Sequence, residues 1–303
     1  MKDFLSYSEL PVLGDLGVRH AWSVLDSEIG TLSFIDSDKT AEGARLVREG
    51  RAFSLNLAID AFDPPLFGRS PVRHVVEVQG NEAQDVLDAF NPQASSQLDG
   101  LAHVRAREHG FFGGRTDLEA AREQIGIHHV AARGIATRGV LLDLAGHDEI
   151  DKVTPFDGRM YDAGLLAEIA REQGVDVRAG DVVLIHTGWT AHFLRMDAEE
   201  RAAKRAWNGL RADEAMAQWL WDRRVAAVGA DNPAVEAAPG SRDIGSLHRR
   251  LIPALGMSMF ELLDLEALAA ACRVSGRWEF FFVSVPLRIA GGVSSPANAM
   301  AIL

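Results

Sequence analysis

The stretch Asp181-Val-Val-Leu-Ile-His-Thr187 decides the fold, because it is continuously apolar between two polar ends. A short apolar run of this kind, rich in β-branched residues, predicts a strand that is buried on both faces. Gly139-Val-Leu-Leu-Asp-Leu144 predicts a second buried strand for the same reason. Two further strands are predicted over 225–229 and 279–285.

Helices are predicted between these strands, over 163–174, 213–223 and 264–271. Gly174 stands where a helix commonly ends, and Asp213 and Asp264 can cap the N-termini of the other two helices. Strands that alternate with helices indicate a mixed α/β core with at least some parallel pairing.

The N-terminal third is richer in strands and loops. The sequence pattern predicts a helix over 36–50 that ends at Gly50, and strands over 52–59 and 72–78. The chain contains no internal repeat or long linker. We therefore expect one domain over 41–303, with 1–40 as an extension packed on it.

Composition limits the class of protein. The chain has 303 residues, of which 47% are hydrophobic and 24% charged, as in ordinary globular proteins. Its net charge of -12 argues against nucleic-acid binding, which rests on basic patches. The single cysteine, Cys272, favours a reducing compartment. With no secretory signal and no apolar run near the ~20 residues of a membrane span, we expect a cytoplasmic protein without a membrane partner.

Several common enzyme motifs are absent. The sequence has no Gly-rich dinucleotide fingerprint, no P-loop and no Gly-x-Ser-x-Gly nucleophile elbow. Cys272 is interpreted as a small buried apolar residue and not as a nucleophile.

Two stretches concentrate residues that can bind a metal or carry a proton. Residues 91–103 hold Gln93, Gln97, Asp99 and His103 among small neighbours, and Asp with His suits a divalent metal. From spacing alone, a surface loop with a capping Asp is the favoured alternative. Farther on, His248 precedes Glu261, which lies in an apolar stretch where a carboxylate is costly unless it is paired or metal-bound. Each of these two, taken alone, is more simply a core or surface residue.

Together these stretches resemble the cyclase family, which includes bacterial kynurenine formamidase and isatin hydrolase. The family carries His-x-Gly-Thr-His-x-Asp-x-x-x-His; Asp99 and His103 match its Asp and last His. Gln93 and Gln97 replace the two earlier histidines, as in a larger-chain branch. The resemblance runs in unbroken order from about residue 40 through His248 and Glu261. Its other blocks lie at 111–114, 138–143, 180–189, 229–232 and 286–298.

The resemblance implies a swivelling β/β/α domain, a barrel-like mixed sheet flanked by helices. It also implies that Asp99, His248 and Glu261 ligate a metal and that His103 is the general acid/base. Gln97 and Gln93 are additional ligand candidates. This oxygen-rich set favours manganese or magnesium over zinc, and one ion over two. We expect one divalent ion, manganese or zinc, in a homodimer or homotetramer.

The resemblance implies hydrolysis of a non-peptide C–N bond in a small-molecule substrate such as a formamide or lactam. Lactone hydrolysis, or cyclisation and dehydration in secondary metabolism, is the alternative within enzymes. A small-molecule binder with a decayed metal site is the alternative outside them. Candidate substrate contacts are Phe112, Trp189, Asp231 and Asn232, with core packing as the alternative for the two aromatic residues.

Overall fold

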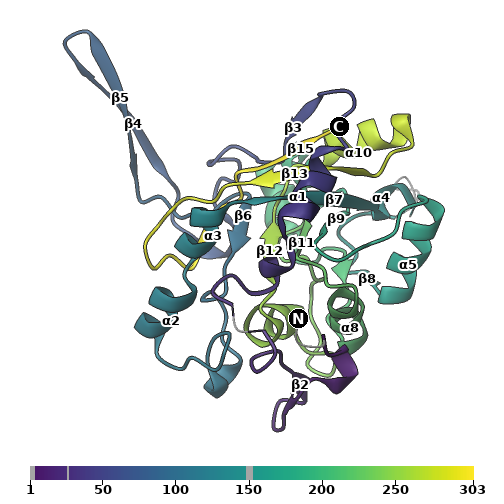
Figure 1. Cartoon of the computed structure of the whole chain (residues 1–303). Coiled ribbons are helices and arrows are strands. Elements are labelled where there is room, and N and C mark those ends of the chain that lie inside the picture. Colours follow the sequence, from purple (N-terminus) through teal and green to yellow (C-terminus); the bar gives the residue numbers. More distant parts are fainter. Residues whose placement is uncertain (1–3, 26, 148–152) are drawn as a thin grey trace.

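The structure is a computed structural model that describes residues 4–25, 27–147 and 153–303 (Figure 1). Its centre is a nine-stranded mixed sheet that curls like part of a barrel, in the order β14-β6-β12-β11-β9-β7-β13-β15-β3. The four central strands, β12, β11, β9 and β7, run parallel, and antiparallel strands continue the sheet on either side. The predicted mixed α/β class is therefore confirmed. The strands of this sheet are β3 (Ala52–Ser54), β6 (Gln97–Asp99), β7 (Ile135–Asp143), β9 (Val182–His186), β11 (Ala227–Ala230), β12 (Ser258–Glu261), β13 (Glu279–Ser284), β14 (Ser294–Pro296) and β15 (Ala299–Ile302).

The apolar run of β9 is buried because the sheet has a core on each face. Val183 and Ile185 pack into one apolar cluster, while Val182 and Leu184 pack into the other. Successive side chains of a strand point to opposite faces, so a strand covered on both sides needs apolar residues at every position.

Helices supply the cover on both faces of the sheet. α5 (Ala163–Glu172) and α8 (Glu214–Asp222) bury residues in the first cluster, and α10 (Glu266–Ser275) buries residues in the second. Asp213 accepts a hydrogen bond from the Met216 amide and caps α8 as predicted. The predicted cap by Asp264 is wrong, because α10 begins after Leu265 without a side-chain cap.

Two predicted elements are longer than the observed ones. The helix predicted over 36–50 is α1 (Ser37–Ala44), because the chain turns there and the amides of Glu49 and Gly50 donate to the Leu303 carbonyl. The strand predicted over 52–59 ends at Ser54. The Leu55 amide still donates to the Ala299 carbonyl of β15, but the chain then turns away and the Leu57 amide donates to Ser96 Oγ.

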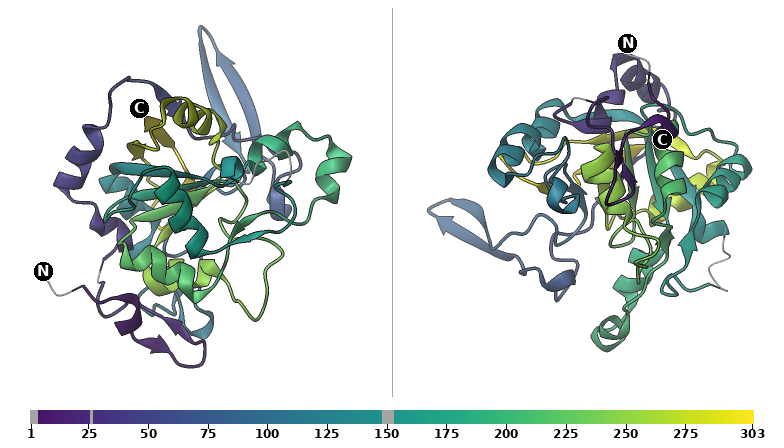
Figure 2. Two further views of the ribbon diagram at one scale, coloured as in Figure 1. Left: turned by 90° about the vertical axis from the view of Figure 1, so that its right-hand side faces the viewer. Right: turned by 90° about the horizontal axis from the view of Figure 1, so that it is seen from below.

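The strand predicted over 72–78 is β4 (Arg73–Gln79), and it pairs only with β5 (Glu82–Asp88). The two strands form a long hairpin that projects away from the body (Figures 1 and 2). We call residues 73–88 the arm. Every residue of both arm strands is exposed.

The N-terminal segment lies against α8. The Phe4 ring stacks on Trp221 with 5.1 Å between ring centroids, and Trp221 Nε1 donates to the Leu5 carbonyl at 2.9 Å. Residues 1–3 and 26 of the predicted 1–40 extension lie outside the described residues. The remaining elements are η1 (Tyr7–Glu9), β1 (Val12–Leu13), β2 (Val18–Arg19), η2 (Gly30–Phe34), η3 (Leu66–Gly68), η4 (Arg107–His109), α2 (Leu118–Ile125), α3 (Ile127–Arg133), α4 (Leu144–His147), β8 (Met160–Tyr161), α6 (Trp189–Arg195), α7 (Ala198–Ala203), β10 (Gly209–Leu210), α9 (Leu247–Arg249) and η5 (Arg250–Leu255). Among the described residues, no helix has both the length and the apolar character that crossing a membrane requires.

Candidate metal centre

Strand pairing places three of the predicted site residues on one face of the sheet. β6 and β12 are antiparallel neighbours, with Gln97 opposite Glu261 and Asp99 opposite Met259. Residues directly opposite, and residues two apart on one strand, share a face. Gln97, Asp99 and Glu261 therefore project together, and all three are buried.

His248 reaches the same place from another element. It lies on α9, whose helical path continues into the π-helical turn η5, a kind of distortion that is frequent at functional sites. Its Nε2 is 2.8 Å from Glu261 Oε1. Asp99, His248 and Glu261 each offer one ligand atom within 4.8 Å of the others. The structure thus brings together the three residues predicted as ligands.

The two glutamines contact the carboxylates of this cluster. Gln97 Nε2 donates to Glu261 Oε2 at 2.5 Å, and Gln93 Nε2 donates to Asp99 Oδ1 at 2.8 Å. Each amide therefore presents its N–H group to an acidic side chain and fixes its orientation. That either glutamine also ligates a metal stays a prediction.

His103 lies at the edge of the cluster. Its side chain is 26% exposed, whereas those of Asp99 and Glu261 are almost fully buried. Its Nε2 is 3.5 Å from Asp99 Oδ2, and Gln93 Nε2 lies 3.3 Å from the same ring nitrogen. The imidazole is close to the cluster and also open to solvent, as a proton carrier must be.

The electrostatics of the cluster are those of a cation site. Burial, together with the charge of Asp99, raises the pKa of Glu261 to about 7. Burial alone would lower the pKa of His248, but its hydrogen bonds to Glu236 and Glu261 raise it well above the usual value. Asp99 Oδ2 is buried without any hydrogen-bond partner. An orphaned carboxylate oxygen beside a second buried carboxylate and an imidazole fits a divalent cation.

The sequence did not point to two residues that hold the cluster. Glu236 Oε1 lies 3.1 Å from His248 Nδ1, on the side of the ring away from Glu261. The signal for it was present, since Glu236 is a lone carboxylate in an otherwise apolar stretch, as Glu261 is. Arg69 donates to the Gln93 carbonyl and, at 3.4 Å, to Gln97 Oε1. Nothing in the surrounding loop sequence distinguishes Arg69 from other surface arginines.

The residues predicted to contact substrate lie in three places. Phe112 is buried, and its ring lies so close to Gly256 that a Cβ there would come within 2.6 Å of it. Trp189 belongs to a buried aromatic cluster that includes Leu262, the neighbour of Glu261. Asp231 accepts hydrogen bonds from the Thr187 amide and hydroxyl, and Asn232 donates to the Asn208 carbonyl. Asp231 and Asn232 thus hold loops at the carboxyl ends of the parallel strands. That Phe112, Trp189, Asp231 or Asn232 contacts a substrate stays a prediction.

A buried ion-paired group lies farther along the carboxyl ends of the parallel strands. His186, at the end of β9, has Nδ1 2.8 Å from Asp143 Oδ1, at the end of β7. Arg273 of α10 donates to the same carboxylate at 2.6 Å. This group ties three elements together and lies apart from the three clustered ligands.

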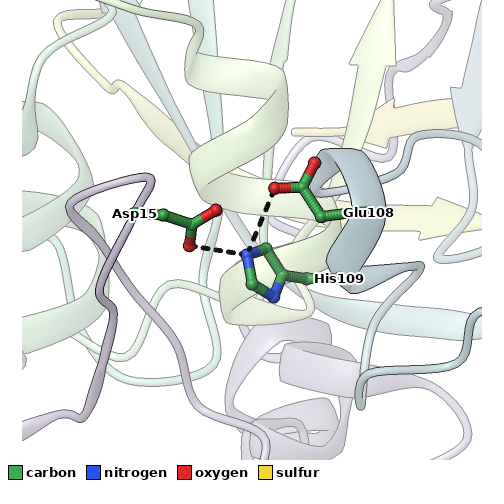
Figure 3. Close-up of side chains that lie close together, drawn as sticks. All are labelled: Asp15, Glu108 and His109. Atoms are coloured by element: carbon green, nitrogen blue, oxygen red, sulfur yellow. Dashed lines mark hydrogen bonds and ion pairs between the residues drawn. The ribbon is translucent and has the colours of Figure 1, made fainter.

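A second trio of potential ligands lies on the surface. His109 Nε2 is 2.7 Å from Asp15 Oδ1 and 3.8 Å from Glu108 Oε1 (Figure 3). Asp15 and Glu108 are exposed. Solvated ion pairs of this kind are common without a metal, and this one joins the β1–β2 hairpin to η4.

Comparisons with known proteins agree with this geometry. The family model described as "Putative cyclase" matches residues 53–237, a range that includes Asp99 and His103 and ends before His248. A crystal structure of a novel cyclase is 27% identical; the match covers 94% of this chain and 99% of that one, with a TM-score of 0.83. No curated protein matches the sequence.

More distant structures share the fold. Isatin hydrolase A from Labrenzia aggregata, bound to benzyl benzoate, is 16% identical, with 87% of this chain and 97% of that one covered and a TM-score of 0.58. An isatin hydrolase bound to the product analogue thioisatinate is 15% identical, with 89% and 99% covered and a TM-score of 0.61. These likenesses confirm the predicted swivelling β/β/α domain.

Proposed function

The chain belongs to the cyclase family, and from that premise we propose that it is a metal-dependent hydrolase that opens a non-peptide C–N bond. The observation that carries the proposal is the convergence of Asp99, His248 and Glu261, with a buried oxygen of Asp99 that accepts no hydrogen bond. The names of two relatives of the same fold, both isatin hydrolases, support a cyclic amide as the substrate class.

Asp99, His248 and Glu261 would hold one divalent ion. Two carboxylates and one imidazole form an oxygen-rich set, which favours manganese over zinc. Such an ion, when bound, supplies Lewis acidity and lowers the pKa of a water molecule. The chain's own part is to hold the carboxylates in place, through Gln97 on Glu261 and Gln93 on Asp99.

His103 would move the proton of the reaction. In amide hydrolysis, water adds to the carbonyl carbon, the C–N bond breaks, and the nitrogen leaves with a proton. A base takes the proton from water and an acid gives one to nitrogen, and one imidazole can do both in turn. His103 is the imidazole at the open edge of the cluster, which suits both transfers.

The test combines metal analysis with a substrate screen. Purified protein should carry close to one manganese or zinc ion per chain, and Asp99→Asn should lose it. Hydrolysis of formamides, lactams and lactones is then followed with and without added manganese. Turnover of an amide that depends on metal and disappears in Asp99→Asn supports the proposal. Metal-loaded protein that hydrolyses only lactones would overturn the choice of the C–N bond.

One observation favours a second candidate, a small-molecule binder without metal. The Gln93 and Gln97 amides and the Arg69 guanidinium already provide N–H donors and positive charge next to the carboxylates. Because these groups already offset the negative charge of the buried carboxylates, the site has less need of a bound cation. Protein that takes up no metal from a manganese-containing buffer and hydrolyses nothing in the screen would favour the binder.

A further inference from the structure

A polar pocket lies between the turn of the β1–β2 hairpin, η4 and the segment that leads into α9, and it encloses about 190 Å³. We call it the arginine pocket. Its charged lining residues are Arg107, Arg242, Arg249 and Arg250 together with Asp15 and Asp243. Four arginines against two aspartates leave a local excess of positive charge, although the net charge of the chain is -12. A local field of this sign attracts anions whatever the net charge of the chain.

The arginines of this pocket lack acidic partners. Among residues 4–25, 27–147 and 153–303, no carboxylate forms an ion pair with any of the four guanidinium groups. Asp15 is directed instead at His109, whose Nε2 is 2.7 Å from Asp15 Oδ1 (Figure 3). Arg249 Nε is buried and has no hydrogen-bond partner. A buried N–H group without an acceptor costs free energy, so an acceptor brought in by a ligand is favoured at this pocket.

The pocket is held in shape by its own chain. Arg250 Nε donates to the Ala212 carbonyl at 3.1 Å, and its Nη2 donates to the Ile244 carbonyl at 3.2 Å. Gly245 approaches the same guanidinium so closely that a Cβ there would lie 3.3 Å from Nη2. Arg107 has a φ of 50°, a costly conformation for a residue other than glycine, and one that is frequent at binding sites. Because Arg250 is fixed before any ligand arrives, binding has less conformational entropy to remove.

We propose that the arginine pocket binds a small dianion of the phosphate type. Its excess of two positive charges matches a dianion, and guanidinium N–H groups bind phosphate oxygens in pairs. Its volume is below the roughly 300–1,000 Å³ of pockets that take drug-sized ligands, so the ligand is small. Inorganic phosphate and a phosphate monoester of a small molecule both present the same group. The inference goes beyond the proposed hydrolysis and does not depend on it, because the lining contains none of the three clustered ligands.

The first experiment is calorimetric titration of the protein with inorganic phosphate at constant ionic strength and about pH 8, well above the second pKa of a phosphate group. About one phosphate per chain should bind. Arg107→Gln and Arg242→Gln, on exposed arginines from separate segments, should each weaken binding at least about 10-fold, because each removes a charge-assisted hydrogen bond. Arg48→Gln, on an exposed arginine outside the pocket, should leave it unchanged. No binding at about 10 mM phosphate, or equal weakening in Arg48→Gln, overturns the proposal.

The second experiment tests the sign of the charge and the class of anion. Asp243→Asn should tighten phosphate binding, because it removes a repelling charge from the lining. Methanesulfonate, a tetrahedral monoanion, should bind at least about 10-fold more weakly than phosphate, because only half of the excess charge is matched. Weaker phosphate binding in Asp243→Asn, or equal affinity for the two anions, contradicts the proposal. Tighter binding of glycerol phosphate than of inorganic phosphate identifies a phosphorylated small molecule as the ligand, and the reverse order identifies phosphate itself.

A control separates this pocket from the candidate metal centre, where a bound metal ion would also attract phosphate. Asp99→Asn removes a proposed metal ligand and leaves the arginine pocket intact. Phosphate binding that persists in Asp99→Asn and is weakened in Arg242→Gln belongs to the pocket. Binding that is lost in Asp99→Asn and kept in Arg242→Gln belongs to the metal centre. That second result overturns this inference and leaves the proposed function standing.

Discussion

Glu236 is the residue on which the orientation of His248 depends. Its carboxylate accepts from one ring nitrogen and leaves the other, Nε2, toward Asp99 and Glu261. A carboxylate in this position fixes the tautomer of a metal-ligating histidine. Glu236→Gln should therefore weaken manganese binding roughly 10–100-fold.

Equilibrium dialysis against manganese measures the effect of Glu236→Gln. The control is Glu214→Gln, on an exposed carboxylate of α8. Unchanged affinity in Glu236→Gln would show that His248 is not a ligand or needs no such support.

His103 is predicted to act on protons and not on the metal. His103→Ala should lower kcat by roughly 10²–10⁴-fold while the metal content stays unchanged. Turnover is measured at rising manganese with the substrate that the screen identifies. Full recovery at high manganese would contradict the acid/base role and leave His103 as a support for Asp99.

At the scale of single residues, the sequence led to Asp99, His103, His248 and Glu261 only through the ordered resemblance to a family. Composition and spacing alone favoured a surface loop for the first two. Arg69 could not be predicted from the sequence. It contacts Gln93 and Gln97 only because the fold of residues 69–97 brings this loop arginine next to them.

At the scale of secondary-structure elements, the Asp143–His186 ion pair links β7 to β9. This pair should make the free energy of unfolding depend on pH. Burial would lower the pKa of His186, but Asp143 and Glu266 raise it from 6.5 to about 9. The contribution of His186 to the free energy of unfolding is complete below pH 6.5 and is lost as the pH rises through 9. Burial would raise the pKa of Asp143, but His186 and Arg273 lower it to about 2. The contribution of Asp143 to the free energy of unfolding is present above pH 3.8 and is lost as the pH falls through 2.

Both contributions are complete only between about pH 4 and 6.5, and they share one ion pair, so they do not add. The free energy of unfolding should fall by about 3 kcal/mol at most between pH 6.5 and 9 on account of His186. Urea titrations across this range measure it. His186→Gln should flatten the slope, and an equal slope in the variant would refute the assignment.

The contact of α1 with β7 gives another prediction at this scale. Glycine in a helix usually costs up to about 1 kcal/mol relative to alanine. At Gly43, however, a Cβ would lie 2.6 Å from the Thr137 backbone carbon, which cannot move without disturbing the sheet. Gly43→Ala should therefore destabilise the protein by about 1–3 kcal/mol in urea unfolding, the usual cost of overpacking. A stabilised variant would mean that helix propensity wins over the clash.

The buried strands and their helices were predictable because their apolar patterns are long and regular. β5 and β6 were not. β5 is largely polar, and β6 has only three residues, Gln97–Asp99, two of them polar. Their strand character comes from pairing with β4 and β12, which no local pattern encodes.

For the whole molecule, the N-terminal segment should be part of a single cooperative unit. Tyr7 and Leu10 are 1% exposed and pack into the same cluster as β9. Deleting residues 1–10 should lower the free energy of unfolding by about 3–6 kcal/mol, since two large side chains lose their burial. Urea unfolding followed by tryptophan fluorescence measures it. Equal stability of the shortened chain would show that the segment is only an attachment.

The order of strands in the sheet also governs when activity can first exist during synthesis. β6 lies between β12 and β14, and its contact with β12 joins residues 164 positions apart. At roughly 5–20 residues per second, a ribosome needs about 10–30 s to add that much chain. Until then β6, which carries the proposed ligand Asp99, has neither neighbour, and we expect the nascent polypeptide to be inactive. Premature termination before Glu261 should thus yield an inactive fragment in which both edges of β6 and the outer edges of β7 and β11 are unpaired, for chaperones to shield or proteases to remove.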